Sequence, residues 1–271
     1  MKSRMSLTIG GALVLLLLAT ALLSLVWTPH DASHIDASRQ LAPPDVGHPL
    51  GTDQFGRDVL SRLMEGARIT VFAGVVAVGI ALLAGVPMGV VSGMSGGWLD
   101  NVVMRVSDFL LAFPALLLAI LLAAVYGTGT LTAMVAIGIA SAPGFARVSR
   151  AATLRVMAGE YIDAARLAGR SRTAIAVRHV VPNILDVVIV QASVSFATAV
   201  LAEAALSYLG LGTVPPTPSW GRMLQESQDL LFSTPELCLW PGLATAAAVL
   251  GLNLLGDGLR DRVDPTLEGV R

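Results

Sequence analysis

The sequence predicts an all-α integral membrane protein with six transmembrane helices and with both termini in the cytoplasm. Three observations predict this fold class. The 271 residues are 54% apolar and only 14% charged, with a mean hydropathy of +0.72, whereas an ordinary soluble domain is about 25% charged. Apolar stretches of membrane-spanning length recur along the chain. Lysine and arginine gather in the connections on one side of those stretches.

The first span is expected at 7–27, directly after Lys2 and Arg4. A stretch of about 20 apolar residues can cross a bilayer core of about 30 Å, and it exceeds the apolar region of a usual signal peptide. No small-residue cleavage site precedes Trp27. We therefore expect an uncleaved transmembrane helix.

Five further spans are expected, each near the length that a tilted helix needs. They lie at about 71–92, 106–126, 129–147, 184–206 and 237–256. The polar connections 28–70 and 207–236 then fall on one side of the membrane, and 148–183 falls on the other. If the N-terminus is inside, thirteen of the 18 lysines and arginines are cytoplasmic, including Arg271. This asymmetry indicates an N-in, C-in topology.

The second predicted span contains a stripe of small residues. Gly85, Gly89 and Gly93 recur at every fourth position, a pattern that lets two helix backbones approach closely. Prolines also fall within or beside the spans, namely Pro87, Pro114 and Pro143. Glycine and proline are common in membrane helices in any case, so these residues leave open whether the helices bend and move.

Several classes of site are disfavoured. The single cysteine, Cys238, excludes an intramolecular disulfide and a CxxC motif. Four histidines show no metal-ligand spacing; they are His30, His34, His48 and His179. A net charge of −1 gives no indication of nucleic-acid binding. We therefore expect no metal, no cofactor and no nucleic-acid partner.

The polar segment EYIDAARLAGRSRTAIAVRHVVPN, residues 160–183, interrupts this apolar chain. Good helix formers run from Glu160 to Ala168, Gly169 stands where a glycine ends a helix, and Ser171 can cap a second helix. Pro182 is tolerated in the first turn of the next span. The segment is expected to form a short helix, a tight turn and a second helix.

Small side chains give the first helix a low-profile face, formed by Ala164, Ala165 and Ala168. Such a face suits a helix that another protein accepts in a groove. It suits equally a helix that lies on the protein's own cytoplasmic surface. The pattern alone leaves both interpretations open.

The arrangement Asp163-Ala164-Ala165, followed by Gly169 and Pro182, resembles the EAA loop of ABC-importer permease subunits. Asp163 stands where that family usually has glutamate, and His179 stands where it often has isoleucine. In the family this loop is the coupling helix that docks into a cleft of the cytoplasmic ATPase. The resemblance implies that the ATPase-coupling residues are Glu160, Tyr161, Asp163, Ala164, Ala165, Gly169 and Arg170.

Three other segments are similar to hallmark segments of the DppC/OppC-type permeases of peptide and nickel importers. They are HPLGTDQFGRDVLSRLMEGARIT (48–70), SYLGLGTVPPTPSWGRML (207–224) and NLLGDGLRDRVDP (253–265). The four motifs together cover about 40–268. They imply a type I ABC importer permease fold in the cytoplasmic (inner) membrane, surrounded by lipid.

The outer segments also have a physical interpretation. Val59, Leu60, Leu63 and Met64 alternate with charged residues in a pattern that suits an amphipathic helix at the outer membrane interface. Trp220 follows a proline-stiffened loop and suits the same interface. Carboxylates and a histidine in this region (His48, Asp53, Asp58) are expected to serve turns and helix caps rather than a metal. We expect residues 1–70 to form an N-terminal helix with this interfacial segment, and residues 71–271 to form a five-helix core with the coupling loop at 148–183.

The resemblance implies that this chain is a non-catalytic half of a peptide importer. Its expected partners are a second permease of DppB/OppB type, two cytoplasmic ATP-binding subunits and an extracytoplasmic solute-binding protein. Nickel is the alternative cargo. A secondary transporter would better fit intramembrane ion ligands, which are scarce here, and a membrane-embedded hydrolase would need a histidine base within the spans, whereas all four histidines lie in connections.

Overall fold

Ten α-helices account for most of residues 2–263, the part of the chain that the computed structural model describes, and no β-strand occurs there. Arg271 and the last two residues of the 253–265 motif lie outside it. The helices are α1 (Lys2–Leu23), α2 (Val59–Ser95), α3 (Gly97–Ala112), α4 (Ala115–Tyr126), α5 (Thr130–Met157), α6 (Glu160–Leu167), α7 (Arg172–Ile175), α8 (Val181–Tyr208), α9 (Trp220–Ser227) and α10 (Glu236–Val263). All-α architecture is thus confirmed.

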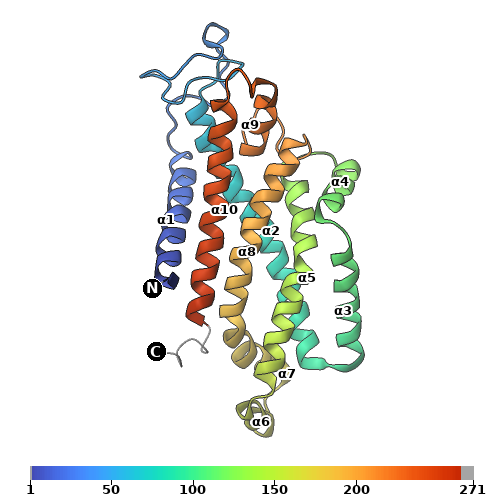
Figure 1. The fold of residues 1–271 in the computed structure, drawn as a ribbon. Coiled ribbons are helices and arrows are strands. Elements are labelled where there is room, and N and C mark those ends of the chain that lie inside the picture. Colours follow the sequence, from blue (N-terminus) through green and yellow to red (C-terminus); the bar gives the residue numbers. More distant parts are fainter. Residues whose placement is uncertain (1, 264–271) are drawn as a thin grey trace.

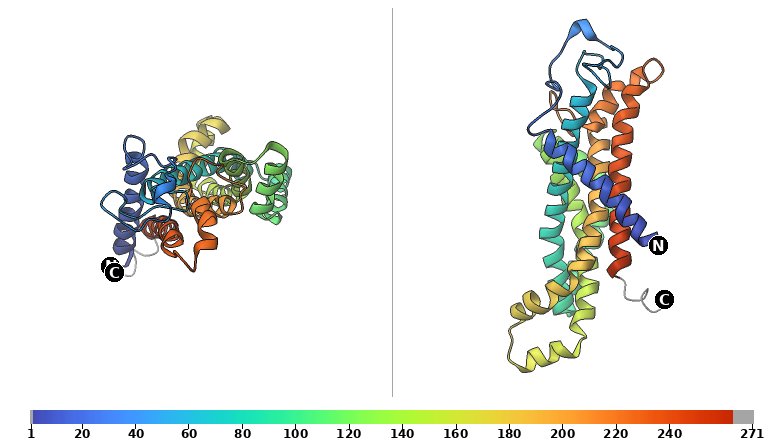
Figure 2. Two further views of the ribbon diagram at one scale, coloured as in Figure 1. Left: turned by 90° about the horizontal axis from the view of Figure 1, so that it is seen from above. Right: turned by 90° about the vertical axis from the view of Figure 1, so that its left-hand side faces the viewer.

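The long helices form a bundle with α2, α5 and α8 at its centre. Helices α1 and α10 lie side by side at one edge, and α3 with α4 lies at the opposite edge (Figures 1 and 2). The N-terminus, the end of α10 and α6 point toward the same end of the bundle, while α9 and the segment 24–58 cover the other end. This arrangement agrees with the expected N-in, C-in topology.

Within residues 2–263, five helices are long and apolar enough to cross a membrane, and α3 with α4 supplies a sixth crossing if the bent pair counts as one span. The span expected at 106–126 is not one continuous helix but falls on the bent pair α3 and α4. The chain bends by 83° between α3 and α4, because Phe113 ends α3 in an extended conformation and Pro114 begins α4 as its N-cap.

The predicted interfacial helix in 48–70 is wrong. Residue 59 begins α2, which continues for 37 residues through the expected domain boundary at residue 70. The start of α2 is buried because it packs against α9: Arg62 is 2% exposed, and its Nη1 and Nη2 donate to Asp53 at 2.6 Å and to Glu226 at 2.8 Å. Trp220, expected at the membrane interface, is only 4% exposed, and its Nε1 donates to the Leu63 carbonyl at 2.9 Å.

The expected caps at this end are present. Asp58 is the N-cap of α2, where its Oδ2 accepts from the Ser61 amide at 2.7 Å. Asp53 accepts from the amides of Phe55 and Arg57 at 2.8 and 3.0 Å. Asp53 also accepts from the Arg57 guanidinium at 2.7 Å. These carboxylates therefore order the outer cap, which we define as residues 28–58 together with α9.

Candidate functional site at the arginine-rich end

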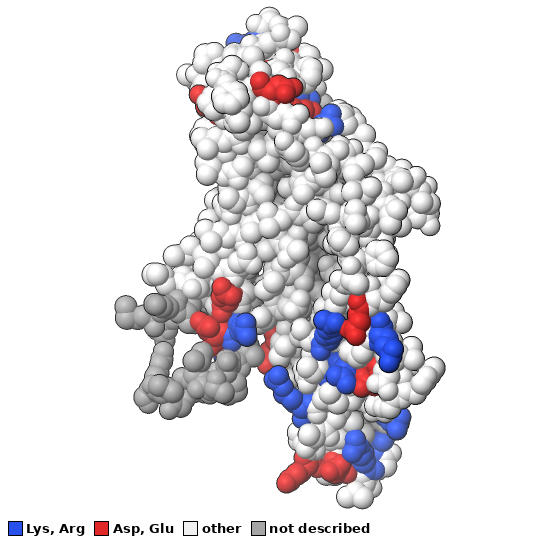
Figure 3. Space-filling view, turned by 45° about the vertical axis from the view of Figure 1, so that its right-hand side comes forward, with Lys and Arg blue, Asp and Glu red and all other residues white. Residues whose placement is uncertain are grey.

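Helix α6 stands beyond the end of the bundle, at the side where arginine side chains gather (Figures 1 and 3). The chain leaves α5 at Met157, turns through Ala158 and Gly159, and enters α6 at Glu160. Glu160 and Asp163 lie in the first turn of α6, where the helix dipole favours negative charge. The short helix predicted from the sequence therefore forms at the predicted place.

The inner face of α6 is fixed to the bundle. Ile162 is fully buried and Ala165 is 9% exposed, and both belong to a core cluster with Val90 of α2, Ala152 of α5 and Ile175 of α7. Burial of such side chains stabilises a site by about 25 cal/mol per Å² of apolar area. Helix α6 is thus attached to the core through these two side chains.

The outer face of α6 carries exposed side chains of a different kind. Glu160, Asp163, Ala164 and Leu167 all point away from the buried side, and Leu167 is 90% exposed. Asp163 accepts from Arg166 at 2.9 Å on the exposed surface. Leu167 is therefore a single exposed apolar side chain on a face that otherwise carries carboxylates and a small residue.

The turn after α6 has the geometry of a Schellman motif. Gly169 adopts a φ of +74°, its amide donates to the Arg166 carbonyl at 3.0 Å, and the Arg170 amide donates to the Ala165 carbonyl at 3.1 Å. Glycine adopts this left-handed conformation at the least cost, and asparagine tolerates it better than other residues. No atom lies within 4 Å of a Cβ built on Gly169, so the requirement for glycine comes from the backbone alone.

The second helix of the segment also forms, but it is not separate from the next span. Ser171 caps α7 by accepting from the Ala174 amide at 3.2 Å. A π-helical turn at Ala176–Val180 then carries the chain into α8, so that residues 172–208 form one membrane-length helix. His179 in that turn lies beside Tyr161 of α6, with 6.2 Å between the ring centroids.

The structure brings the seven expected coupling residues together, in different orientations. Glu160, Asp163 and Ala164 lie on the outer face of α6, Tyr161 lies at its side, and Gly169 and Arg170 form the exposed turn. Ala165 is buried and belongs to the core cluster. Sequence reasoning missed Leu167, although its spacing of three from Ala164 and seven from Glu160 places it on the outer face.

Helix α5 connects this site to the bundle through the glycine stripe. A Cβ on Gly85 would lie 2.3 Å from the Ala142 carbonyl oxygen, and one on Gly93 would lie 2.8 Å from Thr153 Cβ. The backbones of α2 and α5 therefore touch along this stripe, as the small-residue pattern predicts. Helix α6 follows α5 after two residues, Ala158 and Gly159.

Comparisons with known proteins agree on one family. Residues 85–269 match the family described as "Binding-protein-dependent transport system inner membrane component". The glutathione transport system permease protein GsiD of Pectobacterium atrosepticum is 40% identical over 260 residues, which cover 96% of this chain and 86% of the relative. The di/tripeptide transport system permease protein DppC of Pseudomonas aeruginosa is 40% identical over 269 residues, which cover 97% and 89%.

A third relative and a solved structure extend the comparison. The dipeptide transport system permease protein DppC of Alkalihalophilus pseudofirmus is 38% identical, with 96% of this chain and 86% of the relative covered. A chain of the MetNI methionine ABC transporter in an inward-facing conformation matches the fold with a TM-score of 0.62 at 19% identity, covering 75% of this chain and 97% of that one. The likeness to the MetNI chain concerns the fold alone.

Proposed function

Since the chain belongs to the family of binding-protein-dependent transport system inner membrane components, it is a permease subunit of an ABC importer, and we propose that it couples ATP hydrolysis in partner subunits to the uptake of di- and oligopeptides. The observation that carries the proposal is the form of α6. Two side chains of its inner face, Ile162 and Ala165, belong to the core cluster, and its outer face exposes Leu167 after the carboxylates of the first turn.

Helix α6 is the element that meets a cytoplasmic ATP-binding subunit in this proposal. Leu167 and Ala164 enter a groove of that subunit, while Glu160, Asp163 and Arg170 make polar contacts at its rim. Tyr161, Ala165 and Gly169 position the helix and its turn. Amphipathic helices commonly bind grooves through anchors at such spacings.

Movement of the ATP-binding subunits is converted into movement of the permease through α5. Because α6 is short and packed on the core, it moves as one body with the end of α5. The close contact between α5 and α2 along the glycine stripe then transmits the displacement across the membrane. Rigid-body movement of packed helices is an established way to alternate the side from which a central pathway is open.

The remaining partners follow from the family. A second permease of DppB/OppB type completes the pathway, two ATP-binding subunits supply energy, and an extracytoplasmic solute-binding protein delivers the cargo. This chain itself does not hydrolyse ATP in the proposal, since its sequence has no G-x-x-x-x-G-K-[ST] phosphate-binding loop.

Short peptides are the proposed cargo because the relatives are named for glutathione, dipeptides, and di- and tripeptides. Nickel remains the alternative cargo. The test is uptake into proteoliposomes that hold this chain with its partner permease, both ATP-binding subunits and the binding protein. We expect accumulation of labelled dipeptide or tripeptide that depends on ATP and on the ATP-binding subunits.

Two outcomes contradict the proposal. Accumulation of peptide without ATP-binding subunits would indicate a secondary transporter. ATP-dependent accumulation of nickel with no peptide uptake would leave the importer assignment in place and replace the cargo.

A further inference from the structure

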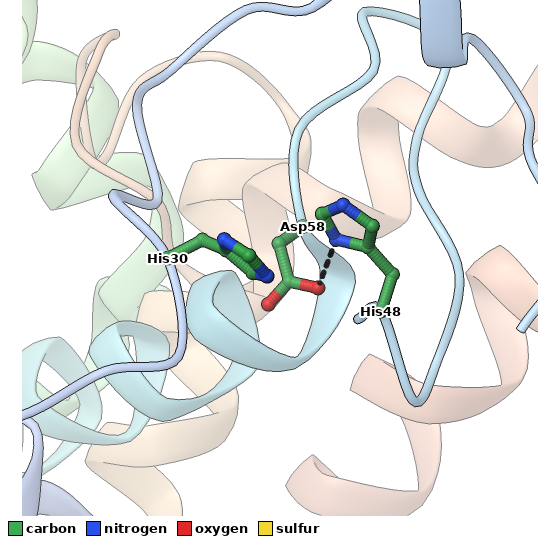
Figure 4. Close-up of side chains that lie close together, drawn as sticks. All are labelled: His30, His48 and Asp58. Atoms are coloured by element: carbon green, nitrogen blue, oxygen red, sulfur yellow. Dashed lines mark hydrogen bonds and ion pairs between the residues drawn. The ribbon is translucent and has the colours of Figure 1, made fainter. Parts of the chain in front are cut away.

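Two histidines and one carboxylate meet on the outer cap, at the start of α2 and at the opposite end of the bundle from α6 (Figure 1). His30 follows α1, His48 lies in the loop before α2, and Asp58 is the N-cap of α2. Each offers one ligand atom, and these atoms all lie within 4.8 Å of one another. Figure 4 shows the two imidazole rings beside the Asp58 carboxylate, and the ring centroids are 4.3 Å apart. His30 thus meets His48 and Asp58, which lie 18 and 28 positions further along the sequence.

Each of the three side chains is held in place by its neighbours. The His30 amide donates to Ser61 Oγ at 2.9 Å, and that hydroxyl donates to Asp58 Oδ2 at 2.6 Å. Asp45 accepts from the His48 amide at 2.6 Å. Asp58 Oδ1 remains directed at His48 Nδ1, 2.9 Å away. The loop and the helix start therefore place the ligand atoms before any ligand arrives.

The surroundings leave room for additional ligands. The cluster lines an open hollow of about 380 Å³, so water can complete a coordination shell. Asp58 is buried and His48 is only 13% exposed in its side chain, whereas His30 lies at the surface. Asp53, which the sequence placed beside His48 and Asp58, faces Arg57 and Arg62 instead.

We propose that His30, His48 and Asp58 bind a divalent first-row transition cation on the outer cap. Two imidazole nitrogens and one carboxylate oxygen form a ligand set that suits Zn²⁺ or Ni²⁺ and does not suit Mg²⁺ or Ca²⁺. The bound cation ties the segment after α1 to the first turn of α2. Water occupies the remaining positions, as in three-ligand protein sites for Zn²⁺.

The alternative is a hydrogen-bonded cluster that binds no cation. Two substitutions made together distinguish a cation site from such a cluster. His30 Nε2 lies 2.8 Å from the Gly47 carbonyl oxygen, where it can donate, and His48 Nδ1 can donate to Asp58. His30→Gln and His48→Asn place amide donors near those two nitrogens, and neither amide is a strong zinc ligand. The double variant therefore keeps the hydrogen bonds and loses the cation site.

The experiment uses the full chain, purified with its partner subunits and without a polyhistidine tag. Zn²⁺ is titrated by calorimetry, and Tm is measured with and without Zn²⁺. We expect saturable binding of one Zn²⁺ per chain and a rise in Tm, because a ligand that binds only the folded state stabilises it. The double variant H30Q/H48N should lose both effects while its Tm without metal stays near that of the wild type. The control H34A, which alters another histidine of the same hollow, should retain both.

A second measurement does not depend on any variant folding correctly. Co²⁺ added to the wild-type complex should produce visible d–d absorption bands, and added Zn²⁺ should abolish them. No such bands and no saturable Zn²⁺ binding would overturn the proposal. So would binding that persists in H30Q/H48N, since the site would then lie elsewhere in the complex.

Discussion

A Cβ atom on Gly89 of α2 would lie only 2.3 Å from the carbonyl oxygen of Ala146 of α5. The two helices therefore approach backbone to backbone at this point, where Ser149 Cβ would also lie 2.8 Å from the added atom. Since α5 leads directly into α6, this contact joins the proposed coupling site to a central helix of the bundle.

Gly89→Ala should push α2 and α5 apart. Overpacking of this kind costs about 1–3 kcal/mol, so we expect a lower Tm and reduced uptake. Gly79→Ala is the matched control on the same helix, because no atom lies within 4 Å of a Cβ at Gly79. Alanine there should leave Tm unchanged or raise it slightly through helix propensity. Equal Tm values for the two variants would show that α2 and α5 are not in close contact.

Glu226→Gln should destabilise the outer cap. Glu226 accepts from Arg57 and Arg62 at 2.6 and 2.8 Å. Both arginines keep Asp53 as a partner after the change, so the cost should be below the value of about 3–5 kcal/mol for a buried charge that loses its only partner. Glu65→Gln is the control, because Glu65 and Arg68 are 3.8 Å apart and partly exposed, a kind of pair worth about 0–1 kcal/mol. A Tm comparison of the two variants checks this prediction, which fails if E226Q melts no earlier than E65Q.

The same carboxylate predicts how stability depends on pH. Burial alone would raise the pKa of Glu226, but the guanidinium groups of Arg62 and Arg57 and the hydrogen bond from Arg222 together hold the pKa below its usual value of 4.5. A lowered folded-state pKa adds stability that is complete above the ordinary value and is lost as pH falls through the folded one. The difference in Tm between wild type and E226Q should therefore shrink as pH falls below 4.5. A difference that stays constant would contradict this linkage.

The contacts within the outer cap could not be predicted from the sequence. Arg62 and Glu226 are 164 positions apart. The residue pattern around position 60 therefore predicted an amphipathic helix with an exposed charged face. In the fold, Arg62 is buried and pairs with Glu226. Trp220 was misplaced for the same reason, because its hydrogen-bond acceptor at Leu63 lies far away in sequence. The cluster of His30, His48 and Asp58 has no recognisable ligand spacing either.

Local features were predicted more successfully. The end of α6 at Gly169, the cap at Ser171 and the close approach at Gly85, Gly89 and Gly93 depend on residues near in sequence or on one helix face. Whether the chain bends at Pro114 stayed open in the sequence, because a proline allows a change of direction without fixing its angle.

Leu167 should lie within reach of an ATP-binding subunit. In a Cys238→Ser background, Leu167→Cys labelled with benzophenone maleimide should form a photo-adduct with that subunit, because Leu167 is 90% exposed at the end of α6. Val46→Cys is the control, since Val46 is fully exposed on the outer cap and should form no such adduct. An active complex with no adduct at Leu167 would place the contact elsewhere.

The central claim is that α6 and its turn couple ATP hydrolysis to uptake, and the ratio of peptide imported to ATP hydrolysed tests it most directly. The measurement compares Gly169→Val with Gly169→Asn in proteoliposomes that contain equal amounts of the chain. Valine is strained at the φ of +74° found here, by about 1–2 kcal/mol or more, whereas asparagine tolerates that conformation. We expect G169V to hydrolyse ATP with little uptake and G169N to stay near the wild-type ratio. A wild-type ratio for G169V would contradict the account.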